Sequence, residues 1–167
     1  QIGYVFLSKD DPATALDHYR QAMEIRARLS EEFPLNMDYR SLIAVGYYNI
    51  AEAQNNLADH KGALESNRRY AAITAELAAA DSKNASHRSG IAFGHLRIGD
   101  RLLILGDTAA ALSEYRRALP LFVAEADADP INLWKRAAMI EARTKMALAL
   151  AKAGETTAAG EQCAQTF

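Results

Sequence analysis

Apolar, small and polar residues return along this chain with a fixed period of 48 positions. Alanine occupies one phase of that period, at Ala15, Ala63, Ala111 and Ala159. Further positions share the spacing: Ile2, Ile50, Ile98 and Met146; Gly3, Ala51, Gly99 and Ala147; Leu16, Leu64 and Leu112; Asn36, Asn84 and Asn132; Arg40, Arg88 and Arg136. A constant period of this size indicates an array of structural repeats.

Each period predicts two helices. In the third, Asn84 is a suitable N-cap, and apolar residues between Ile91 and Leu105 recur at helical spacing. Gly106 suits the left-handed position that ends a helix, and Pro120 predicts a local kink in the helix that follows. Applied to the whole chain, the pattern predicts helices over 1–8, 12–32, 37–57, 60–80, 85–105, 108–127, 131–153 and 156–167.

The centre of each period resembles a tetratricopeptide repeat. The third period carries the resemblance best, through Ile98-Gly99, Leu102, Gly106-Asp107, Ala111-Leu112, Tyr115 and Ala118-Leu119. In the second period, Gln54, Asn67 and Tyr70 depart from the usual residue types. The resemblance implies an all-α solenoid of antiparallel helix pairs that forms a right-handed superhelix. The expected units of this single domain are 1–35, 36–83, 84–131 and 132–167, of which the first and the last are incomplete.

The period is longer than that of the family, whose repeat has about 34 residues. The extra residues amount to about four helical turns, which predicts longer helices and not inserted loops. The segments 77–84 and 128–132 resemble a bacterial subgroup of these arrays that is often attached to protein kinases or other signalling domains. No glycine-rich phosphate loop or kinase catalytic motif occurs in the chain. We expect the sequence to be a piece of a longer protein.

Composition narrows the function classes. The net charge of -2 argues against a nucleic-acid binder, which needs a basic face for phosphates. No apolar run approaches the ~20 residues of a membrane span. The single cysteine, Cys163, excludes an internal disulfide, and the four histidines lack the spacing of a zinc site. We therefore expect no catalytic residues, no metal and no cofactor.

The family resemblance implies a concave binding face lined by the first helix of each pair. Transferred by repeat phase, the residues expected on this face are Tyr48, Glu52, Asn55, Phe93, Leu96, Arg97, Asp100, Leu103 and Thr144. Their mixed character suits a peptide or helix with apolar anchors and some basic groups. For Phe93, Leu96 and Leu103, the alternative is a place in the core. For the polar residues, the alternative is a solvated face without a ligand.

The arginines at 40, 88 and 136 invite interpretation as an anion-binding ladder. Acidic residues precede each of them, at Glu31 and Glu32, at Asp81, and at Asp127 and Asp129. Structural ion pairs across the junctions between units are therefore the preferred interpretation.

The function expected from the sequence is a non-catalytic interaction module that binds a protein or peptide, as a regulatory part of a bacterial signalling protein. The alternatives are a spacer or dimerisation segment of a larger enzyme, with a homodimer formed through uncapped ends, and a small-molecule sensor. The expected state is a soluble domain in the cytoplasm, with the outer side of a membrane-anchored parent as the alternative.

Overall fold

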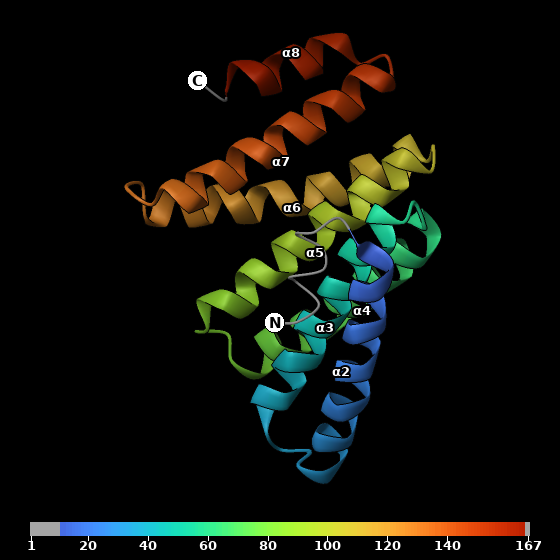
Figure 1. The fold of residues 1–167 in the computed structure, drawn as a ribbon. Helices are drawn as coiled ribbons and strands as arrows, with labels where there is room; N and C mark the ends of the chain where they lie inside the picture. The colour runs from blue at the N-terminus through green and yellow to red at the C-terminus, as the bar shows by residue number, and fades with distance from the viewer. Residues whose placement is uncertain (1–10, 166–167) are drawn as a thin grey trace. The chain divides into compact units, whose positions relative to one another are not determined.

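The computed structural model describes residues 11–165, and this part of the chain is all-helical, without strands (Figure 1). The helices are α2 (Pro12–Glu32), α3 (Met37–Asn56), α4 (His60–Ala80), α5 (Ala85–Ile104), α6 (Thr108–Ala128), α7 (Leu133–Lys152) and α8 (Thr156–Ala164). The predicted all-α class is thereby confirmed, with boundaries within two residues of expectation from α2 to α7. The helix expected over 1–8, with Ile2 and Gly3, lies outside the described residues.

The helices repeat in length as the sequence repeats in composition. The helices α2, α4 and α6 each have 21 residues, and α3, α5 and α7 each have 20. Short turns at 33–36, 81–84 and 129–132 alternate with shorter ones at 57–59, 105–107 and 153–155. The length of the 48-residue period is therefore taken up by long helices, as predicted, and the connecting turns are short. The right-handed solenoid remains a prediction.

Polar side chains cap the helices at their N-termini. Asn36 Oδ1 accepts a hydrogen bond from the amide of Asp38 at 3.0 Å, and Asn84 accepts in the same way from Ser86 at 3.0 Å. Asn132 caps α7 by accepting from the amides of Trp134 and Lys135. Asp59 and Asp107 cap α4 and α6. These contacts satisfy first-turn amides that have no partner inside the helix, which explains why the boundaries repeat so closely.

The turns that follow the first helices require a left-handed residue. Gly106 has a φ of 90° and Gly154 a φ of 83°, whereas Ala58, at the same phase, has a φ of 57°. Glycine adopts this conformation without the clash that a Cβ atom introduces. The C-terminal role expected for Gly106 is confirmed, and the second period forms the same turn with an alanine.

Two compact units make up the chain, with the boundary between His87 and Arg88. In the N-terminal unit, α3 packs against both α2 and α4, and a core cluster forms around Ile43, Ile73 and Leu77. In the C-terminal unit, α7 packs against α6 and α8, and the core gathers around Tyr115 and Phe122.

The helix α6 continues through Pro120, and this proline is exposed. Within residues 11–165, none of the helices combines the length and apolar character that a membrane crossing requires.

Candidate functional site

Two residues of the binding face expected from the sequence lie in the core. Leu96 is 0% exposed and Leu103 is 9% exposed, and both belong to the apolar cluster of the C-terminal unit. Phe93 is half-buried and packs edge-on against Phe122, with ring centroids 4.9 Å apart. The core alternative therefore holds for Leu96 and Leu103, and Phe93 packs on the edge of the same cluster.

Asp100 is the centre of a buried polar network and not an open groove residue. Its carboxylate accepts hydrogen bonds from Tyr115 Oη at 2.9 Å, from Lys145 Nζ at 2.8 Å and from Arg97 Nη1 at 3.3 Å. Glu141 joins the network 3.1 Å from Arg97 Nη1. Three helices, α5, α6 and α7, meet at this carboxylate. The Asp100 carboxylate uses its hydrogen-bonding capacity within the unit, and Arg97 is one of its donors. Both residues are therefore better explained as structural groups.

Burial of Tyr115 has an electrostatic consequence. Burial, followed by the neighbouring Asp100 carboxylate, raises the pKa of the Tyr115 phenol far above its ordinary value. The hydroxyl therefore remains protonated and donates to Asp100, as the geometry requires.

Four predicted face residues remain at or near the surface. Tyr48, Glu52 and Asn55 are half-buried on α3, and Thr144 is exposed on α7. The ring of Tyr48 lies 5.8 Å from that of Tyr70 on α4. The hydroxyl of Thr144 donates to the carbonyl of Ile140 at 2.9 Å.

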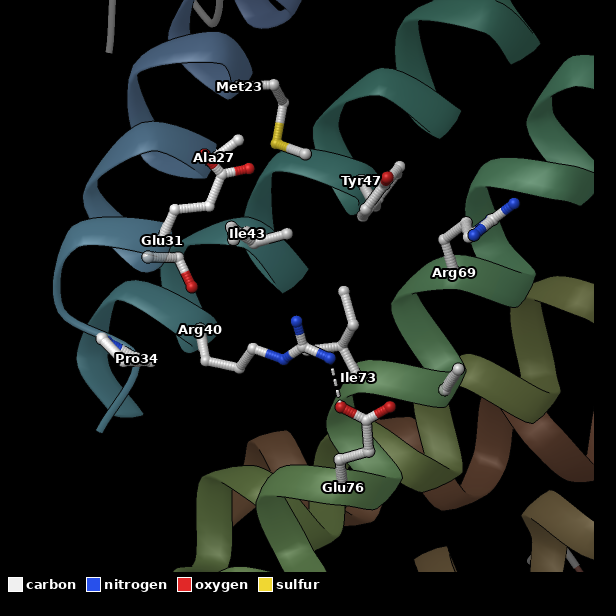
Figure 2. A pocket seen from close by; sticks show the side chains of 12 residues that line it. Met23, Ala27, Glu31, Pro34, Arg40, Ile43, Tyr47, Arg69, Ile73 and Glu76 are labelled. Carbon is white, nitrogen blue, oxygen red and sulfur yellow. Dashed lines mark hydrogen bonds and ion pairs between the residues drawn. The ribbon is translucent and has the colours of Figure 1, made fainter. Parts of the chain in front are cut away.

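A concavity of the N-terminal unit lies elsewhere, between α2, α3 and α4 (Figure 2). We call it the α2–α3–α4 cleft, and its volume is about 580 Å³. Its lining residues are Met23, Ala27, Ser30, Glu31, Pro34, Arg40, Ile43, Tyr47, Arg69, Ala72, Ile73 and Glu76. Ile43 and Ile73 belong to the core below, while Met23, Ala27 and Tyr47 are half-buried. The floor is therefore apolar and the rim charged, an arrangement common in ligand-binding clefts.

Gly46 on α3 allows α2 and α3 to approach each other closely at this cleft. A Cβ atom on Gly46 would lie 2.0 Å from Met23 Sδ, so the thioether of α2 occupies the space that a larger residue would take. Arg26 Nη1 also joins α2 to the carbonyl of Leu42 on α3, at 3.0 Å. Gly46, in the middle of a long helix, was the one available sequence signal for this close approach. The cleft itself depends on three helices and was not predicted.

The charged groups of the rim are arranged on opposite walls. Arg40 of α3 donates to Glu76 of α4, and Arg69 Nε donates to Glu65 at 3.1 Å. Glu31 stands on the α2 wall, and within residues 11–165 it has no ion-pair partner. Figure 2 shows Glu31 on one side of the apolar floor and Arg69 on the other.

The partner of Arg40 corrects one expectation from the sequence. The acidic residues that precede it, Glu31 and Glu32, were the expected partners, but the ion pair forms with Glu76, 36 positions later. The two helices α3 and α4 are antiparallel neighbours, so the start of one meets the end of the other. At the junction before α7, Asp129 does form an ion pair, but with Lys135 at 3.0 Å.

Groups that could support metal or covalent chemistry are dispersed in the described part of the chain. Among residues 11–165, no three His, Cys, Asp or Glu side chains gather as a metal site would require. Cys163 is exposed on α8, and His95 Nδ1 lies 2.7 Å from Glu114 Oε2 between α5 and α6.

No protein-family model matches the chain, and a search of curated proteins finds no match either. The tetratricopeptide resemblance therefore rests on the repeated residues alone.

Proposed function

We propose that this chain is a non-catalytic interaction module and that it binds a polypeptide segment in the α2–α3–α4 cleft. The observation that carries the proposal is the cleft of about 580 Å³ with an apolar floor and charged side chains on its rim. Clefts of roughly 300–1,000 Å³ are typical of ligand sites. As the sequence resemblance suggests, such a module would serve as a regulatory part of a bacterial signalling protein.

The chemistry of the cleft defines the segment it would accept. An apolar side chain would pack on Met23 and Tyr47, where half-buried surface is available. A basic group would face Glu31 on the α2 wall, whereas Arg40 and Arg69 are already paired with Glu76 and Glu65. The spacing of the charged side chains favours a peptide over a compact small molecule, because these side chains stand apart along the rim and do not converge on one point.

The test selects binding peptides from a displayed random library with the full chain as target. The affinity of an enriched peptide is then measured by fluorescence anisotropy for the wild type and for two matched variants. Ala72→Arg places a charge in the cleft, whereas Ala75→Arg adds the same charge on an exposed α4 position outside it. We expect Ala72→Arg to weaken binding by about tenfold or more, equivalent to about 1.4 kcal/mol, and Ala75→Arg to change it less than about twofold.

A third variant separates this cleft from the first-helix face expected from the sequence. Tyr48→Ala removes the largest remaining side chain of that face without altering the cleft lining. Loss of peptide binding in Tyr48→Ala but not in Ala72→Arg would transfer the function to the first-helix face. A library that yields no binder to the folded chain would contradict the interaction-module proposal itself.

A further inference from the structure

The α2 wall of the cleft carries a carboxylate, that of Glu31, without a counter-charge in residues 11–165. The other charged side chains of the lining are already paired, Arg40 with Glu76 and Arg69 with Glu65. Within each of these pairs the two charges cancel. A ligand that enters the cleft therefore meets the negative charge of Glu31 and little else that attracts an opposite charge.

The C-terminal end of α2 adds to the negative potential around Glu31. The last carbonyl groups of a helix lack partners within it and together act as about half a negative charge. Basic side chains in the last turn usually compensate this charge, but the last turn of α2 has none and ends instead on Glu31 and Glu32. The two carboxylates oppose the helix dipole in the free protein, and a bound cation would relieve that conflict.

The apolar part of the cleft lies at a defined distance from this carboxylate. Met23 and Glu31 both line the cleft from α2, and their positions are about 12 Å apart along the helix axis. Tyr47 of α3 lies at the Met23 end, and Figure 2 shows these two side chains toward the top of the view and the Arg40–Glu76 pair toward the bottom. An extended peptide covers about 12 Å in three to four residues, and a long basic side chain shortens the spacing needed.

We infer that the α2–α3–α4 cleft selects a cationic polypeptide segment, in which a lysine or arginine pairs with Glu31 and lies about two to four positions from an apolar residue packed on Met23 and Tyr47. The inference rests on the proposed function of the cleft as a polypeptide-binding site, and it adds the charge and the spacing of the segment. Acidic segments are rejected, because their charge is repelled both by Glu31 and by the end of α2.

The test compares two glutamates at neighbouring positions of α2. Glu31→Gln removes the charge that lines the cleft, whereas Glu32→Gln removes the same charge from an exposed position outside the lining. Both variants should keep the thermal stability of the wild type, checked by circular dichroism, because each removes an unfavourable charge from a helix C-terminus. A displayed random peptide library is selected against all three proteins. We expect lysine and arginine to be enriched at the stated spacing by the wild type and Glu32→Gln, and not by Glu31→Gln.

A double-mutant cycle then separates direct pairing from general attraction. The affinity of one enriched peptide, and of its version with glutamine in place of the basic residue, is measured by fluorescence anisotropy. We expect the change in the peptide or Glu31→Gln in the protein to weaken binding by about fivefold, and both changes together to weaken it no further. Added salt should weaken the wild-type complex more than the Glu31→Gln complex. Glu31→Lys should reverse the selectivity and prefer the peptide with glutamate in place of the basic residue.

Failure of this inference is distinguishable from failure of the proposed function. Peptides whose binding is abolished by Ala72→Arg but unchanged by Glu31→Gln would overturn the cationic selectivity and retain the cleft as a peptide site. Equal losses of affinity in Glu31→Gln and Glu32→Gln would also overturn the inference, because the preference would then come from the end of α2 as a whole and not from the carboxylate in the cleft. A library that yields no binder would overturn both proposals together.

Discussion

The hydroxyl of Tyr115 on α6 donates a 2.9 Å hydrogen bond to the carboxylate of Asp100 on α5, and the two side chains are 1% and 6% exposed. The same carboxylate holds Lys145 of α7 at 2.8 Å. A charged group this deeply buried is tolerated only when its hydrogen-bonding capacity is satisfied. The relationship therefore links three helices through one acceptor.

Tyr115→Phe should lower the stability of the chain by about 1–3 kcal/mol, because it withdraws a donor from a buried charged acceptor and leaves the ring in place. Urea unfolding followed by circular dichroism measures the change. Tyr47→Phe is the matched control: Tyr47 is half-buried, and its hydroxyl has no hydrogen-bond partner among residues 11–165. It should change stability by less than about 0.5 kcal/mol. Equal effects in the two variants would show that the Tyr115 hydroxyl contributes nothing specific.

Gly99→Ala should destabilise the C-terminal unit although alanine is the better helix former. A Cβ atom at position 99 would lie 2.6 Å from Cε1 of Tyr115, and that ring is too deeply buried to move aside. The clash costs about 1–3 kcal/mol, which exceeds the gain of about 1 kcal/mol in helix propensity. Gly160→Ala on α8 meets nothing within 4 Å and should stabilise by about 0.5–1 kcal/mol. Thermal unfolding of both variants checks the opposite signs.

The same pair explains a departure within the repeat. Asn67 stands at the phase of Tyr115, and Ala51 stands at the phase of Gly99. Where the smaller side chain replaces the tyrosine, a methyl group fits on the facing helix, and both Ala51 and Asn67 are buried. The second period therefore differs from the third at two positions that compensate each other in volume.

Helix boundaries could be predicted because their signals are local. Asn36, Asn84 and Asn132 each cap a helix that starts at the next residue, and Gly106 adopts the left-handed conformation expected of it. The binding face was harder to predict, since apolar periodicity does not separate core from groove. The spacing of Leu96 and Leu103 along the helix is compatible both with packing against a neighbouring helix and with lining a binding groove. The partners of Asp100 and Arg40 lie on other helices and required the packed structure.

Lys135→Met should raise the pKa of Asp129 toward its ordinary value. Hydrogen bonds from Lys135 and, next, from Asn132 lower the pKa of this carboxyl in the folded chain. A lowered folded pKa means that the contribution to stability is present above the unfolded pKa of 3.8 and is lost as the pH falls through the folded value. Titration followed by NMR of the aspartate carboxyl carbons measures the shift. An unchanged Asp129 pKa in Lys135→Met would show that the ion pair is not formed in solution.

Ala58→Gly should stabilise the chain by relieving the turn between α3 and α4. Ala58 has a φ of 57°, while the other two turns of the same phase use Gly106 and Gly154. A left-handed conformation costs a residue with a Cβ atom about 1–2 kcal/mol, and part of the gain is offset by the greater freedom of glycine in the unfolded chain. The net gain should be about 0.5–1 kcal/mol, measured by urea unfolding. Gly106→Ala is the converse change in an equally open turn, because nothing lies within 4 Å of its Cβ position. Gly106→Ala should destabilise the chain by a similar amount. Equal stabilities for the wild type and the two variants would mean that Ala58 does not hold the left-handed conformation in solution.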